Sequence, residues 1–190
     1  TYFADKEALN LAAVAGDIDM QGRHINMSSF PVLKENEEAG NYHVVTWPTF
    51  GGSDAAFTLN QTWIVNEPEL GALFQEKDFR VALSHAIDRE EMWGLVWRGA
   101  AEFEGPKWES PLQQDEEDAI YADAAVYDVD LANELLDKVG LTERDDEGFR
   151  LMKDGRRMSI LMEGSITYEV KAQVMELVSQ YWAEVGVEAI

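Results

Sequence analysis

Residues 79–92 read Phe-Arg-Val-Ala-Leu-Ser-His-Ala-Ile-Asp-Arg-Glu-Glu-Met and carry the clearest helical pattern in the chain. Their apolar side chains recur at helical spacing on one face, namely Phe79, Ala82, Leu83, Ala86 and Ile87. Asp88, followed three residues later by Glu91, has the spacing of a capping box, which marks the start of a new helix. Residues 78–98 are therefore predicted to form two abutting helices, the second buried through Trp93, Val96 and Trp97 and ended by Gly99.

Helices and short extended segments alternate on both sides of this stretch. Further helices are predicted at 5–16, capped by Asp5 with a stripe of Ala8, Leu11, Ala12 and Ala15, and at 30–40, 68–74, 128–140 and 170–186. Extended segments are predicted at 17–20, 42–47, 55–63 and 187–190, a hairpin around Asp154-Gly155, and a long loop at 100–127. This alternation predicts an α/β fold in a single domain over residues 1–190.

Composition narrows the class of protein. The 190 residues carry 15 Lys and Arg against 37 Asp and Glu, a formal charge of −22, with 46% hydrophobic residues and no Cys. Such a charge repels phosphate and disfavours nucleic-acid partners. The hydrophobic content suffices for a core, and no apolar run reaches the roughly 20 residues that span a bilayer. Because the chain begins at Thr1 and stops inside a strand pattern at Ile190, we expect a piece of a longer polypeptide.

A search for catalytic motifs finds little. His24, His43 and His85 are far apart and form no HExxH pair, and no Gly-rich nucleotide loop or GxSxG elbow is present. Asp17 and Asp19 have carboxylates that suit a divalent ion, but a charged turn entering a strand explains them more simply. No metal or cofactor is therefore expected. Paired carboxylates leave a glycoside hydrolase as the competing enzyme class.

Five segments, in order along the chain, resemble family 5 of the extracellular solute-binding proteins, the dipeptide-, oligopeptide- and nickel-binding components of ABC importers. Residues 79–92 resemble that family's "fR-x-ALs-x-AIDRe" signature. The other matching segments are Ala8–Met20, Phe57–Asn60, Asp130–Leu141, and Gly148–Arg150 continued by Asp154-Gly155 and by Trp182 with Val185–Val187.

The resemblance implies a class II periplasmic-binding-protein-like lobe, with an incomplete mixed sheet flanked by helices, from the second of two lobes. It further implies a non-enzymatic transport function: two lobes close around a ligand, most simply an oligopeptide, and deliver it to ABC permease subunits. Oligosaccharides and nickel chelates stay open as ligands, as does a sensory version fused to a DNA-binding domain. The first lobe of the same polypeptide would be a partner, and the location would be extracytoplasmic, periplasmic or lipid-anchored on the outer face of the membrane.

Candidate ligand-binding residues follow from general α/β physics, because ligands sit at carboxyl ends of strands and at helix N-termini. The rule selects one group at the end of a strand that Tyr2-Phe3 would finish at the start of the chain, one after the strand predicted at 17–20, and one beside a break predicted at 48–53. These residues are Phe3, Asp5 and Lys6, then Gln21 and His24, and finally Trp47. One lobe supplies only one wall of such a site, so we expect the isolated chain to bind ligand weakly or not at all.

Overall fold

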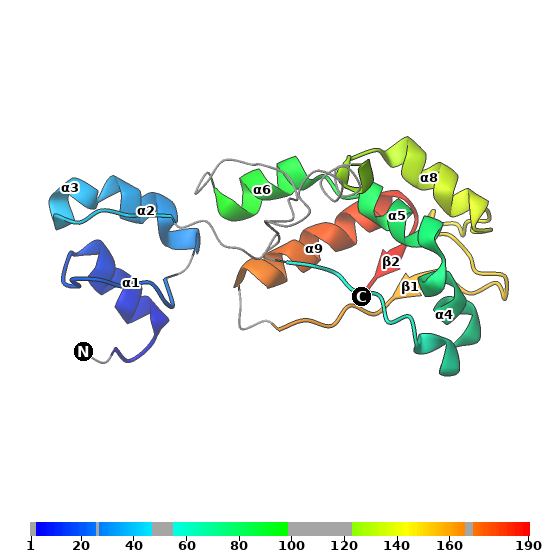
Figure 1. The fold of residues 1–190 in the computed structure, drawn as a ribbon, viewed down its shortest axis with the longest axis horizontal. Coiled ribbons are helices and arrows are strands. Elements are labelled where there is room, and N and C mark those ends of the chain that lie inside the picture. The colour runs from blue at the N-terminus through cyan, green and yellow to red at the C-terminus, as the bar shows by residue number, and fades with distance from the viewer. Residues whose placement is uncertain (1–2, 26, 47–54, 99–122, 166–168) are drawn as a thin grey trace, which may run out of the picture. The chain divides into compact units, whose positions relative to one another are not determined.

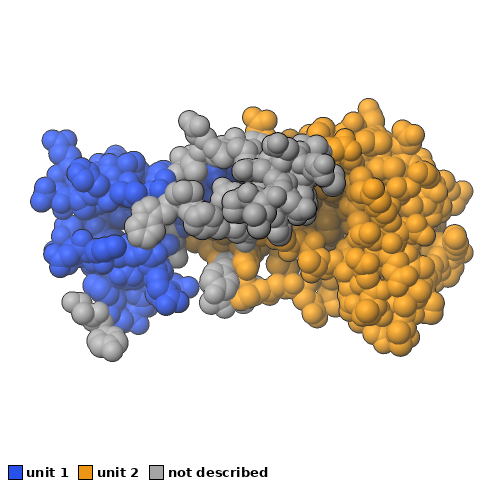
Figure 2. Space-filling model, in the orientation of Figure 1, with its two compact units in different colours: residues 1–49, 91–103 blue, residues 50–90, 104–190 orange. Residues whose placement is uncertain are grey.

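A computed structural model of the chain describes residues 3–25, 27–46, 55–98, 123–165 and 169–190 (Figure 1). The chain divides into two compact units, residues 1–49 with 91–103 and residues 50–90 with 104–190 (Figure 2). Each unit has its own set of helices, and the described β-strands belong to the second.

Unit 1 begins with α1 (Lys6–Val14), which starts where the sequence predicts. The Asp5 carboxylate accepts a hydrogen bond of 2.8 Å from the Ala8 backbone N–H, which confirms the predicted cap. The predicted apolar stripe is wrong, however. Leu9 and Asn10 are the buried residues of α1, whereas Leu11 is 65% exposed. Asn10 is accommodated in the buried face because its amide donates to the carbonyls of Lys6, at 2.6 Å, and His24, at 3.4 Å.

The predicted helix at 30–40 is interrupted. A 3-10 turn (η1, Met27–Ser29) leads into α2 (Phe30–Glu35), and α3 (Glu37–Gly40) follows after Asn36. Asn36 uses its side-chain amide to bond the carbonyl of Val32, at 2.8 Å, and its backbone lies outside the helical region. Such a local side-chain bond competes with helix continuation, which a hydrophobic pattern does not reveal.

The strands predicted at 17–20 and 42–47 are not formed by residues 17–20 and 42–46, while Trp47 lies outside the described residues. In the first segment, Asp17 donates its N–H to the Ala12 carbonyl and so completes the end of α1. In the second, Val44 donates its N–H to the Glu37 carboxylate at 2.5 Å. These donors are used locally, and neither segment meets a strand partner among the described residues.

Unit 2 is built on α4 (Pro68–Gln75), α5 (Lys77–His85), α8 (Val129–Lys138) and α9 (Glu169–Glu184). The predicted face of α5 is confirmed as core, since Phe79 and Ala82 are fully buried. The helix itself packs against α8 (Figure 1). Trp182 ties α9 to α5 by donating its indole N–H to the Leu83 carbonyl at 3.0 Å. As predicted, α6 (Arg89–Trp97) is a separate helix, most of which belongs to unit 1.

The sheet of unit 2 is a β–α–β unit. Strands β1 (Ser159–Ile160) and β2 (Glu188–Ala189) pair in parallel, with Ser159 opposite Glu188, and α9 connects them. Upstream, the predicted hairpin is confirmed: Leu151 and Arg157 pair antiparallel across a turn in which Gly155 has φ +84°. A second antiparallel bridge joins Arg144 to Arg150. Both senses of pairing therefore occur, as expected for a mixed sheet.

The remaining two segments differ in part from prediction. Residues 55–60 form neither helix nor strand, and the extended segment ends earlier than predicted because a turn at 61–62 leads into the 3-10 helix η2 (Trp63–Val65). The long loop predicted at 100–127 falls mostly on residues 99–122, which lie outside the described residues. At its end, residues 123–125 are helical rather than irregular.

Candidate functional site

The residues selected from sequence lie in unit 1, and the structure brings some of them together. Asn10 links the carbonyls of Lys6 and His24, so the first turn of α1 lies beside the segment that contains Gln21. Gln21 donates its amide to the carbonyl of Arg23, and His24 has a left-handed backbone, with φ 62°.

The N-terminal group is therefore partly engaged in its own fold. One carboxylate oxygen of Asp5 caps α1. Phe3 is half-buried, and Asp5 and Lys6 are exposed. Trp47 lies outside the described residues. These residues stay a prediction as a ligand site.

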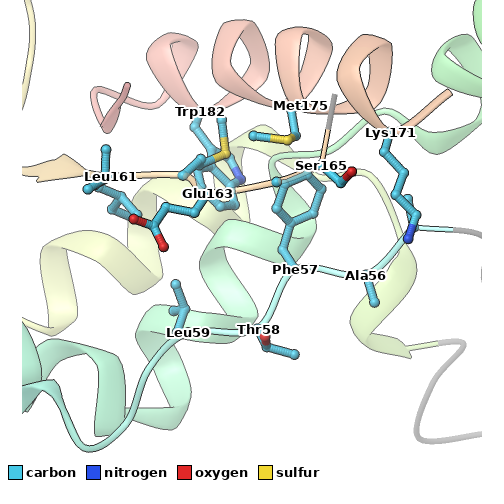
Figure 3. A pocket seen from close by; sticks show the side chains of 14 residues that line it. Ala56, Phe57, Thr58, Leu59, Leu161, Glu163, Ser165, Lys171, Met175 and Trp182 are labelled. Atoms are coloured by element: carbon cyan, nitrogen blue, oxygen red, sulfur yellow. The ribbon is translucent and has the colours of Figure 1, made fainter. Parts of the chain in front are cut away.

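A pocket of about 260 Å³ in unit 2 offers a better-defined candidate. It lies between residues 55–59 and residues 160–165, which continue from β1, and α9 closes it from above (Figure 3). Its walls combine aromatic, aliphatic and charged side chains, among them Phe57, Leu161, Glu163, Lys171 and Trp182.

The position of this pocket follows from the chain order of the β–α–β unit. Residues 161–165 leave the carboxyl end of β1, and Lys171 lies in the first turn of α9. In α/β sheets this junction of strand end and helix start is where ligands are bound. The general rule that selected the N-terminal residues therefore applies here, at a strand that the structure does contain.

The side chains of the pocket combine an aromatic wall with groups of both charges, which suits an amphiphilic ligand. The rings of Phe57 and Trp182 meet edge to face with centroids 5.8 Å apart and form an aromatic wall. Glu163 and Lys171 reach into the pocket on either side of Phe57 (Figure 3). A ligand with an apolar body and both signs of charge would find a complementary group for each part.

Sequence reasoning missed Glu163 and Lys171 as site residues. No motif contains them, and they meet Phe57 only because β1 and α9 fold beside a segment about a hundred residues earlier in the chain. The available signal was the segment Met158–Leu161, apolar except for Ser159, which is followed by a helix and so marks a strand end to which the carboxyl-end rule applies.

A second hollow, of about 490 Å³, lies between α4, the start of α5 and the end of α8. Two of its charges are paired with each other: the Lys138 ammonium contacts the Asp78 carboxylate at 2.6 Å, and the hydrogen bond that it donates to this carboxylate raises the pKa of Lys138. It lies away from the ends of the strands, so its larger volume does not make it the better site.

Residues 79–92, which carry the family's signature pattern, hold another segment of the chain in place. Ser84, His85 and Arg89 bond the carbonyls of three consecutive residues, Ala124 at 2.6 Å, Val126 at 2.7 Å and Ala125 at 3.2 Å respectively. Burial lowers the pKa of the Arg89 guanidinium, which also bonds the Ser84 hydroxyl at 2.7 Å. The most recognisable motif of the chain thus anchors the segment that leads into α8.

Metal binding has no support from the described residues. Among them, no group of three or more His, Asp or Glu side chains is placed to hold an ion. Asp17 and Asp19 are both exposed. Over the same residues, no helix combines the length and apolar character needed to cross a bilayer.

Comparison with known proteins shows what this chain is similar to. A family model described as "Bacterial extracellular solute-binding proteins, family 5 Middle" matches residues 1–190. Among solved structures, an oligopeptide-binding protein, OppA, is similar with a TM-score of 0.69 and 34% sequence identity, over 100% of this chain and 30% of that chain. NikA from Brucella suis, in complex with Fe(III)-EDTA, gives a TM-score of 0.46 and 22% identity, over 62% of this chain and 23% of its own. No curated protein matches.

Proposed function

Because the chain belongs to family 5 of the bacterial extracellular solute-binding proteins, we propose that it is part of the ligand-binding component of an ABC importer for oligopeptides. The observation that carries the proposal is the match of the family model to every residue, together with 34% identity to an oligopeptide-binding protein over the whole chain. That similarity also shows the periplasmic-binding-protein fold. The chain spans less than a third of the OppA structure, so the function proposed here is that of a longer protein.

The pocket of unit 2 supplies one wall of the proposed binding site. Its outer part, where Glu163 and Lys171 reach in, offers a carboxylate and an ammonium group to the charged ends of a peptide. Phe57 and Trp182 offer the apolar surface that peptide side chains need. The N-terminal residues Phe3, Asp5, Lys6, Gln21, His24 and Trp47 are retained as a second, separate proposal for ligand contact in unit 1.

Transport would follow from lobe closure. A ligand that contacts both lobes only when they are closed shifts the equilibrium towards the closed form, which the permease subunits then recognise. We place the protein outside the cytoplasm, in the periplasm or anchored by lipid on the outer face of the membrane. Residues 1–190 would form a single lobe, with the other lobe supplied by the same polypeptide.

A binding function suits the pocket better than a glycosidase does. Glycoside hydrolysis generally requires two carboxyl groups about 5–10 Å apart across the scissile bond. Glu163 is the single carboxylate among the described residues that line the pocket. An acid and a lysine beside an aromatic wall bind well but lack the second acid of that mechanism.

Calorimetry on the whole solute-binding protein tests the proposal. Short peptides, oligosaccharides and nickel–histidine chelates are titrated in turn, and we expect saturable binding of peptides alone. Lys171→Ala should weaken peptide binding at least about tenfold, the equivalent of a lost charged hydrogen bond. Lys153→Ala, which removes another exposed lysine of unit 2, is the matched control and should leave affinity unchanged. Binding of a saccharide or chelate in place of peptides would refute the proposal.

A further inference from the structure

Methionine supplies all the sulfur of this chain, because the sequence contains seven Met and no Cys. The structure separates these side chains by their access to solvent. Met152 is 5% exposed and Met158 is fully buried, whereas Met20 is 78% exposed. Met162 and Met175 are half-buried and line the pocket of unit 2. Two thioethers are therefore open to a small reagent that enters the pocket.

The sulfur of Met175 has little room on one of its sides. The side chain extends from α9 into the pocket (Figure 3), and its Sδ lies against Gly164 in the segment that follows β1. A Cβ added to Gly164 would be 2.3 Å from that sulfur, closer than non-bonded atoms approach. An atom added to the sulfur on this side would therefore displace Gly164, and on the open side it would project into the pocket.

Oxidation is the reaction that adds such an atom to a thioether. A hydroperoxide transfers one oxygen to the sulfur: its O–O bond breaks, an S–O bond forms, and the proton of the transferred oxygen passes to the departing one, which leaves as water or an alcohol. The sulfur loses two electrons and the peroxide gains two, so the balance needs no further reagent. The product is methionine sulfoxide, which is polar where the thioether was apolar.

We propose that Met175 is a modification site at which a hydroperoxide forms methionine sulfoxide and thereby weakens ligand binding in the pocket of unit 2. The effect on ligand rests on the proposed function. A sulfoxide oxygen in the pocket brings a polar group to the aromatic wall of Phe57 and Trp182, and an apolar part of a ligand would have to desolvate it. An oxygen that faces Gly164 instead displaces the neighbour of Glu163, whose carboxylate we assign to one charged end of a peptide. Either orientation lowers the affinity.

The location proposed for the protein favours this chemistry. Extracytoplasmic compartments are oxidising, whereas glutathione and thioredoxin keep sulfur groups reduced in the cytosol. Methionine sulfoxide is returned to the thioether by dedicated reductases, so the modification is reversible. Oxidation of Met175 would therefore lower ligand capture while a hydroperoxide is present, and reduction would restore it.

Peroxide treatment of the whole solute-binding protein tests the inference. All proteins carry Met162→Leu, a swap that cores tolerate well, so that Met175 is the single thioether among the described residues that line the pocket. Hydrogen peroxide is added without ligand, and mass spectrometry of proteolytic peptides follows oxygen uptake at each methionine. We expect sulfoxide at Met175 and Met20, and at least about tenfold slower oxidation at buried Met158. Met158 that stays reduced also shows that the fold is intact.

Calorimetry with peptide gives the second readout. The affinity should fall at least about fivefold after peroxide treatment. With Met175→Leu added, the affinities before and after treatment should be equal. Met20→Leu, which removes an exposed thioether of unit 1, is the matched control, and treatment should weaken its binding as much as that of the parent. Saturating peptide should slow the oxidation of Met175 at least about fivefold, because a pocket buries most of the surface that its ligand contacts.

Three results would overturn the inference. They are a Met175 that stays reduced while Met20 is oxidised, an affinity that survives oxidation of Met175, and an equal loss of affinity in the Met175→Leu protein. The untreated protein tests the proposed function separately. If it binds no peptide, that proposal fails together with the effect on ligand, and the mass spectra alone decide whether Met175 is a modification site. If it binds peptide equally well before and after Met175 is oxidised, the proposed function stands and the present inference is wrong.

Discussion

Arg150 shows how much of the fold can depend on one side chain. It is 1% exposed, and its guanidinium donates to the Val185 carbonyl at 2.8 Å, to the Asn133 side-chain oxygen at 2.8 Å, and to the Leu141 carbonyl. Those carbonyls follow the ends of α9 and α8, where helix dipoles place partial negative charge. An ion pair with Asp137 at 2.5 Å completes the set. One buried cation therefore joins the ends of two helices.

Replacing Arg150 should lower the stability of the fold. Arg150→Met leaves buried carbonyls and an amide oxygen without donors, so we expect the free energy of unfolding to fall by roughly 3–5 kcal/mol. Urea denaturation measures the change. Arg156→Met is the matched control, since Arg156 is 55% exposed and its pairs with Asp154 and Glu67 lie at the surface. Exposed pairs contribute little, and a comparable loss in both variants would contradict the role assigned to Arg150.

At the scale of elements, alanine substitutions at two helical glycines are expected to change stability in opposite directions. A Cβ on Gly71 of α4 would lie 2.1 Å from the backbone nitrogen of Ile64, where α4 packs on η2. A Cβ on Gly94 of α6 would meet nothing within 4 Å. The first glycine therefore permits close packing, while the second merely weakens its helix.

Alanine at these two positions should separate the effects. Gly71→Ala forces backbone apart and should destabilise by about 1–3 kcal/mol or more. Gly94→Ala should stabilise by up to about 1 kcal/mol, the difference in helix propensity. Thermal and urea unfolding of the two variants measure both signs. Stabilisation by Gly71→Ala would show that α4 and η2 are not in contact as described.

The same scale shows which elements a sequence can predict. Helices such as α5 and α8 were predicted well because their caps and apolar faces are local properties, as the Asp128 carboxylate shows by accepting from the Leu131 N–H at 2.8 Å. The strand at 17–20 was predicted from alternation and the strand at 42–47 from its content of β-forming residues, and neither property reveals whether a partner exists. The pocket depends on contacts between residues 55–59 and 160–165, and no local pattern encodes that proximity.

At the scale of the whole molecule, the family could be predicted from the order of five weak motifs, and the comparisons confirm it. The strongest of those motifs turned out to anchor chain segments through Ser84 and Arg89 rather than to contact the proposed pocket. The most recognisable motif therefore identified the fold but not the binding site. The side chains that hold a fold together are constrained as strongly as the side chains that bind a ligand.

The formal charge of −22 is the other property of the whole chain, and it makes a prediction about salt. Self-repulsion destabilises the compact state, and salt screens it, since the Debye length falls from about 30 Å at 0.01 M to about 3 Å at 1 M. Local ion pairs oppose this trend: Arg157 contacts Asp145 and Glu147 at 2.7 Å and Glu188 at 3.0 Å, and salt weakens such pairs. With 37 acidic against 15 basic residues, the repulsion should prevail.

We therefore expect the urea midpoint of the chain to rise as NaCl increases across that range. Asp146→Lys provides the control, because Asp146 is exposed beside Asp145 and its reversal reduces the net charge by two units. The variant should be more stable than the parent at low salt, and the difference should vanish at high salt, where both proteins are screened. A midpoint that falls with added NaCl would instead mean that attractive clusters such as that of Arg157 outweigh the net charge. In that case the acidic surface would be locally compensated, and its excess of carboxylates would carry little energetic weight.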